Sequence, residues 1–168
     1  MSANLFLIGF MGAGKSTVAA KLNQMTSKKL IEMDETIVSN QGMSINEIFE
    51  KYGEARFREI ESELVKTISS EGDCIVSCGG GVVIKPENVE EMKKNGKIVF
   101  LSATPETIFE RVRYSTDRPI LNGHMNVEYI AGLMEKRRAL YEAAADVMIA
   151  TDNKDADEIC NEILALIG

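Results

Sequence analysis

Long apolar runs and basic residues are both scarce in this sequence. No apolar run approaches the roughly 18 residues that a membrane-spanning helix needs. The first strand-like run begins within about four residues of Met1, so we expect no signal peptide ahead of it. Lys and Arg number 19 against 26 Asp and Glu, for a net charge of −7, which argues against a basic nucleic-acid-binding face. We therefore expect neither a membrane nor a nucleic-acid partner.

Cysteine and histidine are also rare. The three cysteines, Cys74, Cys78 and Cys160, form an odd set without the spacing of zinc ligands. Cys74 and Cys78 alternate with Val76 onto one face of a predicted strand, which favours buried packing. Free thiols are typical of a reducing cytoplasm. The single histidine, His124, lies in a polar loop, and we assign it no catalytic role.

The most informative stretch is GFMGAGKST, residues 9–17, which fits the phosphate-binding P-loop pattern. An apolar run over residues 4–8 predicts a buried strand before it, and residues 17–25 predict a helix after it. In this motif the backbone N–H groups and the helix N-terminus bind nucleotide phosphates. Lys15 would reach the β- and γ-phosphates, and the Ser16 hydroxyl would bind Mg²⁺. The residues expected at ATP are Gly12, Ala13, Gly14, Lys15, Ser16 and Thr17. The alternative is a glycine-rich turn with an unrelated lysine.

Strands and helices alternate along the rest of the chain. Further strands are predicted at residues 29–33, 74–77, 97–101 and 147–150. Further helices are predicted at residues 35–40, 44–52, 54–70, 86–95, 104–114, 127–145 and 154–167. This order predicts an α/β fold of three layers, with a parallel sheet covered by helices on both faces. Ligands of such folds bind at the carboxyl ends of the strands. Without a repeat or linker, residues 1–168 are expected to form one domain.

A P-loop alone does not separate kinases from GTPases and ATPases. A guanine-selecting Asn-Lys-x-Asp motif is approached at residues 153–156, but Ala156 replaces the final aspartate. Motor and transport ATPases usually end a strand beside the P-loop strand in an acid, whereas strand 74–77 ends in Ser77 and glycines. Both of these classes are therefore disfavoured.

Several spaced motifs together make the chain resemble the shikimate kinase family over nearly its whole length. The matching elements are Gly9–Thr17, Glu32 to Asp34, Gly42 to Ile45, Phe57 and Arg58 with Glu61, Gly79 to Gly81, Asp117 to Leu121, and Arg137 with Tyr141. The resemblance implies a P-loop small-metabolite kinase with a five-stranded parallel sheet. It implies a helical substrate-binding segment at about residues 34–61 and a mobile lid at about residues 113–125. The implied enzyme is an Mg²⁺-dependent, monomeric phosphotransferase that moves the γ-phosphoryl of ATP to the 3-hydroxyl of shikimate.

The resemblance also implies residues for the acceptor substrate. Arg58 and Arg137 match two carboxylate-binding arginines, and a guanidinium can hold a carboxylate through two parallel hydrogen bonds. Glu61, three residues after Arg58, could hold that side chain in place. Asp34 matches the catalytic aspartate that orients or deprotonates the attacking hydroxyl. The glycines match backbone that approaches the ligand closely, namely Gly79, Gly80 and Gly81. The alternatives are a surface ion pair for Arg58, a helix N-cap for Asp34, and a flexible turn for the glycines.

On the nucleotide side, Arg118 in the expected lid matches an arginine that stabilises transition-state charge, although a solvated loop charge is the alternative. Arg111 matches a residue that stacks on adenine. Glu32 departs from the family, which usually has aspartate there to reach the Mg²⁺ shell through water. Phe49 and Phe57 match walls of the substrate pocket, or else pack in the core.

Two rival functions stay open from the sequence. A kinase for another small metabolite, such as gluconate, would share the fold, but Arg58 with Arg137 and the glycine run favour shikimate. A nucleotide-binding regulator without phosphotransfer is the second rival. The presence of Lys15, Ser16, Asp34 and Arg118 argues against it.

Overall fold

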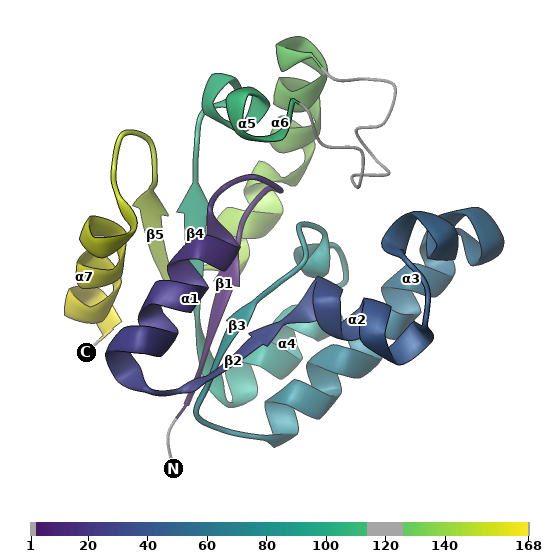
Figure 1. Cartoon of the computed structure of the whole chain (residues 1–168), viewed down its shortest axis with the longest axis horizontal. Coiled ribbons are helices and arrows are strands. Elements are labelled where there is room, and N and C mark those ends of the chain that lie inside the picture. The colour runs from purple at the N-terminus through teal and green to yellow at the C-terminus, as the bar shows by residue number, and fades with distance from the viewer. Residues whose placement is uncertain (1–2, 114–125, 168) are drawn as a thin grey trace.

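The computed structural model describes residues 3–113 and 126–167, which form one α/β sandwich around a five-stranded parallel sheet (Figure 1). The strand order across the sheet is β2-β3-β1-β4-β5. The strands are β1 (Asn4–Ile8), β2 (Lys29–Glu32), β3 (Cys74–Ser77), β4 (Gly96–Ser102) and β5 (Val147–Ala150). Every pair of neighbours runs parallel. The fold class predicted from the alternation of strands and helices is therefore confirmed.

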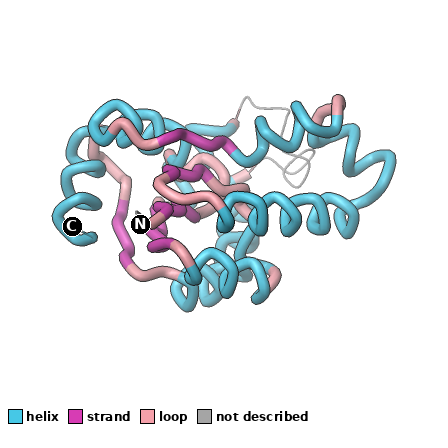
Figure 2. Tube along the Cα trace, turned by 90° about the horizontal axis from the view of Figure 1, so that it is seen from below, coloured by secondary structure: helices cyan, strands magenta, loops and turns pink. Residues whose placement is uncertain are grey.

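Helices cover both faces of the sheet, as Figure 2 shows. The central strand alternates between them, because Leu5 and Leu7 belong to one buried cluster while Phe6 and Ile8 belong to the other. The first cluster takes side chains from α1 (Lys15–Thr26), α5 (Pro105–Val112) and α7 (Ala156–Ile167). The second takes them from α3 (Ile45–Ser70), α4 (Pro86–Lys94), the C-terminal half of α6 (Val127–Ala144), and the 3₁₀ turn η1 (Val82–Ile84).

The boundary after the second strand differs from the prediction. Helix α2 (Met33–Gln41) begins at Met33, so Asp34 lies in its first turn and not at the end of a strand. Glu32 is the N-cap residue, and the N-cap alternative for Asp34 is wrong. Met33 is fully buried, which is why an apolar residue there extends the strand pattern even though the helix has begun. Asp34 and Glu35 suit a first helical turn because it carries partial positive charge.

The features predicted around α3 are confirmed. Ser44 caps the helix, its side chain accepting from the Glu47 amide, and the reciprocal bond from Glu47 completes a capping box. Gly53 has φ 85° and ψ 168°, which interrupts the helix where a break was predicted. The glycine allows this kink because other residues rarely adopt a positive φ. The kink redirects the part of α3 that carries Arg58 and Glu61.

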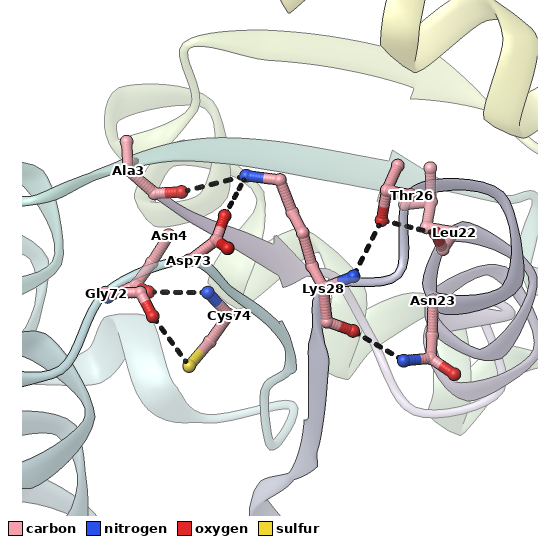
Figure 3. Close-up of polar contacts among 9 residues, drawn as sticks. All are labelled: Ala3, Asn4, Leu22, Asn23, Thr26, Lys28, Gly72, Asp73 and Cys74. Atoms are coloured by element: carbon pink, nitrogen blue, oxygen red, sulfur yellow. Dashed lines mark hydrogen bonds and ion pairs between the residues drawn. The ribbon is translucent and has the colours of Figure 1, made fainter. Parts of the chain in front are cut away.

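At the amino edge of the sheet, polar contacts connect the strands to neighbouring loops (Figure 3). Asn4 is 1% exposed; its side chain accepts from the Cys74 amide at 3.0 Å and donates to the Ile68 carbonyl at 3.2 Å. Lys28 pairs with Asp73 at 2.9 Å nearby. Cys74 and Cys78 pack with Val76 in one cluster, as predicted. All three cysteines are free and buried. In the described ranges no helix has the length and apolar character needed to cross a bilayer.

Candidate active site

A cleft of about 770 Å³ opens at the carboxyl edge of the sheet, between the P-loop and the starts of α2 and α3. Segments from four parts of the chain form its wall, because parallel strands end at the same edge. The residues singled out from the sequence that line this cleft are Gly12, Gly14, Lys15, Ser16, Thr17, Glu32, Asp34, Gly80 and Arg111. The arrangement brings the phosphate-binding motif and the candidate catalytic aspartate into one space.

The P-loop connects β1 to α1 in a conformation that requires glycine. Gly14, the residue before α1, has φ 98° and ψ 13°, in the left-handed region that residues with a Cβ rarely adopt. The Lys15 ammonium folds back across the loop and donates to the Gly9 carbonyl at 2.6 Å and the Phe10 carbonyl at 3.1 Å. The side chain is buried at the base of the cleft. A cation and a helix N-terminus thus face the same space, which suits a polyanion.

Ser16, Glu32 and Ser77 form an oxygen-rich cluster in the cleft wall. The Ser16 hydroxyl donates to Glu32 Oε2 at 2.8 Å, and its oxygen lies 3.4 Å from that of Ser77. Partial burial raises the pKa of Glu32, and the hydrogen bond from Ser16 opposes that shift. Hard oxygen donors of this kind fit Mg²⁺, which keeps several waters and binds through one or two protein groups plus substrate phosphates. Among the residues that the structure describes, no group of three or more Asp, Glu, His or Cys side chains could hold a metal ion.

Arg58 forms ion pairs with two glutamates of α3, one buried and one half-exposed. Its Nη1 donates to Glu61 Oε1 at 3.1 Å, and its Nη2 donates to Glu54 Oε2 at 3.2 Å. The Arg58 and Glu61 side chains are 9% and 1% exposed, so the alternative of a surface ion pair is wrong. Burial raises the pKa of Glu61, and the neighbouring Arg58 guanidinium opposes the shift. The predicted contact between Glu61 and Arg58 is confirmed.

The glycine run after β3 packs directly against charged side chains. A Cβ at Gly79 would lie 2.8 Å from Glu61 Oε2 and 3.1 Å from Asp34 Oδ1, and one at Gly81 would lie 2.6 Å from Arg58 Cζ. Gly80, between them, lines the cleft. The run continues into η1 through hydrogen bonds from Val82 to Gly79 at 3.2 Å and from Ile84 to Gly81 at 3.1 Å. Close approach of charged side chains therefore accounts for glycine at positions 79 and 81.

Helix α6 brings Arg137 to the same glycines from the other side. A Cβ at Gly80 would lie 3.6 Å from Arg137 Nη1, and the guanidinium lies 5.8 Å from the centre of the Phe10 ring. Tyr141, one turn further along α6, donates from its hydroxyl to the Gly80 carbonyl. Arg58 and Arg137 thus lie beside the glycine run and not in the cleft wall itself.

The aromatic pair on α3 and the expected lid complete the predicted site. Phe57 is buried and packs 5.1 Å from the Phe49 ring centre within a small core cluster, so core packing accounts for Phe57. Arg118 and residues 114–125 of the expected lid lie outside the residues that the structure describes.

Arg111 on α5 donates to the Gly12 carbonyl at 2.9 Å and to the Thr151 hydroxyl at 3.4 Å. It lines the cleft beside the P-loop, where an adenine-contacting residue is expected. Thr151 was missed by the sequence analysis. The available signal was its place as the first residue after an apolar strand, at the edge where ligands bind.

Comparison with known proteins gives a consistent set of relatives. The family model described as shikimate kinase matches residues 11–168. A shikimate kinase from Geobacter metallireducens is 42% identical over 95% of this chain and 89% of its own length. One from Dehalococcoides mccartyi is 39% identical over 95% and 90%. The structure of shikimate kinase from Acinetobacter baumannii in complex with shikimate superimposes with a TM-score of 0.95 at 30% identity, covering 99% of this chain and 93% of that one. A gluconokinase from Sinorhizobium meliloti has a TM-score of 0.60 at 19% identity, a likeness that extends to the fold alone.

Proposed function

The chain belongs to the shikimate kinase family, and from this premise we propose how its residues divide between the two substrates. The enzyme transfers the γ-phosphoryl group of ATP to the 3-hydroxyl of shikimate, giving shikimate 3-phosphate and ADP. Because phosphoryl transfer depends mainly on positioning and charge neutralisation, the roles below are those of binding and orientation.

The nucleotide side of the site is built on the P-loop. The backbone of Gly12, Ala13 and Gly14 surrounds the phosphates, and Ser16 and Thr17 lie in the first turn of α1. Lys15 exchanges its carbonyl partners for the β- and γ-phosphate oxygens, a change that its flexible four-carbon stem allows. Arg111 lies at the adenine end. Mg²⁺, when bound with ATP, neutralises charge on the transferring group; Ser16 and Glu32 are the residues that would hold it.

The acceptor side is built on α3, α6 and the glycine run. Arg58 and Arg137 bind the shikimate carboxylate through charge-assisted hydrogen bonds. Glu61 holds Arg58 in orientation from a fully buried position. Asp34 accepts a hydrogen bond from the attacking hydroxyl and orients or deprotonates it. The backbone of Gly79, Gly80 and Gly81 contacts the sugar-like ring where a side chain would obstruct it.

One observation carries the division of roles. Gly79 approaches Asp34 and Glu61, Gly81 approaches Arg58, and Gly80 between them lines the cleft that also contains Lys15 and Ser16. A ring held on the glycine run thus faces a phosphate held on the P-loop. This juxtaposition supports in-line transfer between the two substrates.

The direct test compares two arginines of α3 that lie two residues apart. Arg58→Ala is expected to raise the KM for shikimate by about tenfold or more, because a buried charge-assisted contact is lost. The matched control is Arg56→Ala, since Arg56 pairs only with exposed Glu59 at 3.1 Å and Glu63 at 4.0 Å among the contacts seen. Its KM for shikimate is expected to stay at the wild-type value. Equal KM values for the two variants would refute the assignment of Arg58.

Substrate selectivity is tested by coupling ADP release to NADH oxidation, with shikimate, gluconate and nucleoside monophosphates as acceptors. Turnover is expected with shikimate, and turnover with gluconate alone would contradict the assignment. We also propose that residues 34–61 form the substrate-binding segment of a single domain and that the enzyme is a monomer of the cytoplasm. The role of Arg118 in closing residues 113–125 over ATP stays a prediction from the family motif.

A further inference from the structure

Two side chains from outside the P-loop hold two of its carbonyl groups. Arg111 donates to the Gly12 carbonyl at 2.9 Å, and the Thr151 hydroxyl donates to the Ala13 carbonyl at 3.2 Å. Thr151 is the first residue after β5, is 1% exposed, and lies 138 positions from Ala13 in the sequence. A buried hydroxyl from a distant part of the sequence thus binds one carbonyl of the P-loop.

The Ala13–Gly14 peptide group connects this carbonyl to the cleft. All peptide bonds of the described ranges are trans, and in a trans peptide the C=O and N–H groups point in opposite directions. Because Thr151 holds the Ala13 carbonyl on one side, the Gly14 N–H is directed to the other. Gly14 lines the cleft. The loop therefore presents this N–H to the phosphate space only while the peptide plane keeps its orientation.

Glycine makes that orientation easy to lose. Gly14 has φ 98° and ψ 13°, and a residue without Cβ rotates between positive and negative φ at little cost. A rotation of the Ala13–Gly14 peptide would turn a carbonyl oxygen, and not an N–H, toward the phosphates. An external hydrogen bond to the Ala13 carbonyl opposes this rotation.

The surroundings of Thr151 direct its hydroxyl proton to carbonyl groups. Arg111 Nη1 donates to Thr151 Oγ1 at 3.4 Å, which leaves the hydroxyl proton for an acceptor. The Ser102 carbonyl is an alternative acceptor at 3.0 Å, but it also accepts the Thr151 amide at 2.8 Å. The Ser102 carbonyl thus still accepts the Thr151 amide when the Thr151 hydroxyl donates to Ala13.

We propose that Thr151 is a positioning residue for nucleotide binding, which holds the Ala13–Gly14 peptide so that the Gly14 N–H faces the phosphates. The inference rests on the proposed nucleotide site and adds to it a residue from the far end of the sheet. Thr151 acts through the loop backbone and needs no contact with the nucleotide. Removing its hydroxyl should therefore weaken the binding of ligands that carry phosphate groups and leave the binding of adenosine unchanged.

The test is calorimetric titration of ADP and adenosine into Thr151→Val, which removes the hydroxyl and keeps the shape. We expect the Kd of ADP to rise about three- to tenfold, the range for one lost hydrogen bond, and that of adenosine to stay unchanged. Thr151→Ser should restore the wild-type Kd of ADP. The matched control is Thr67→Val, which removes another hydroxyl-to-carbonyl bond of 3.2 Å at an exposed position of α3. This control should leave both Kd values unchanged.

A second measurement covers the case in which Thr151→Val does not fold. Glycine-selective ¹⁵N labelling of Thr151→Ala gives amide signals from only 13 residues. The shift of the Gly14 amide on ADP addition should be smaller than in the wild-type enzyme, with Gly42 unmoved in both. An unchanged ADP affinity, an equal loss for adenosine, or failure of Thr151→Ser to restore binding would overturn the role of Thr151. If the wild-type enzyme itself did not bind ADP, the proposed nucleotide site and this inference would both fall.

Discussion

Replacing Gly81 with alanine adds one methyl group at the point where the glycine run meets Arg58. Gly81 has φ −104° and ψ 11°, outside the left-handed region, so alanine can adopt the same backbone conformation. The new Cβ would lie 2.6 Å from Arg58 Cζ. Non-bonded carbons settle at about 3.5–4.0 Å, so the guanidinium must move away by about 1 Å.

That displacement acts on a group that is already held in place. Arg58 bonds Glu61 at 3.1 Å and Glu54 at 3.2 Å, and a shift of this size lengthens these bonds or moves the fork away from the carboxylate of shikimate. A hydrogen bond to a charged group contributes about 1.5–3 kcal/mol, which corresponds to a rise of about ten- to hundredfold in the KM for shikimate. The Kd of ADP should stay unchanged, because the contact lies on the acceptor side.

Steady-state kinetics with each substrate varied in turn measures both effects. The matched control is Gly132→Ala, in the middle of α6, where a Cβ would meet nothing within 4 Å. That variant should keep both KM values and gain about 0.5–1 kcal/mol of stability from helix propensity. A double-mutant cycle then identifies the partner: in an Arg58→Ala background, Gly81→Ala should add little, because the side chain that it displaces is absent. Additive effects of the two changes on KM would refute the steric argument.

Further predictions concern the acids, the second arginine and the buried thiol. Asp34→Asn should lower kcat by about a hundredfold or more and leave the Kd of ADP unchanged; near-normal turnover would remove Asp34 from the mechanism. Arg137→Ala should raise the KM for shikimate by about tenfold and that for ATP little, and equal effects would argue against a carboxylate role. Glu54→Ala should lower the KM for shikimate by up to about fivefold, because a half-exposed acid that competes for Arg58 is removed; a raised KM would contradict this. Burial raises the pKa of the Cys78 thiol, so the folded state keeps its proton after the unfolded chain has lost it, and stability should fall as pH rises above the ordinary value of 9.0. Cys78→Ala should reduce that slope in urea unfolding by up to about 1.4 kcal/mol per pH unit; an unchanged slope would exclude Cys78 as its source.

Local patterns predicted most elements but not their ends. Strand β3 (Cys74–Ser77) and strand β5 (Val147–Ala150) have the predicted bounds, because short apolar runs there end in polar or glycine residues. The start of α2 was placed two residues late. Met33 is buried, and an apolar residue next to a strand has the same pattern whether it continues the strand or opens a helix. Which of these occurs depends on tertiary packing, which a single sequence does not record.

In the site as well, contacts between residues close in sequence could be predicted, and contacts between distant residues could not. The P-loop is contiguous, and Arg58 with Glu61 is an i, i+3 pair, so both could be predicted from spacing. The burial of this pair could not be predicted, because the residues that pack over it are the glycines that follow β3. Thr151 was missed for the same reason: its bond to Ala13 joins the ends of β5 and β1, which are separated by β4 in the sheet.

Burial also determines which partner of Arg58 can give way to substrate. Glu61 is 1% exposed and accepts a hydrogen bond from Arg58 Nη1. If Arg58 left Glu61, the Glu61 carboxylate would stay buried without a compensating charge. Glu54 is 52% exposed and bonds Nε and Nη2, the edge of the fork that can bind a carboxylate through two bonds. Water can solvate Glu54 when it is displaced, at a cost of about 1 kcal/mol or less. The substrate carboxylate can therefore replace Glu54 while Glu61 keeps the guanidinium in orientation, so binding needs little reordering of Arg58.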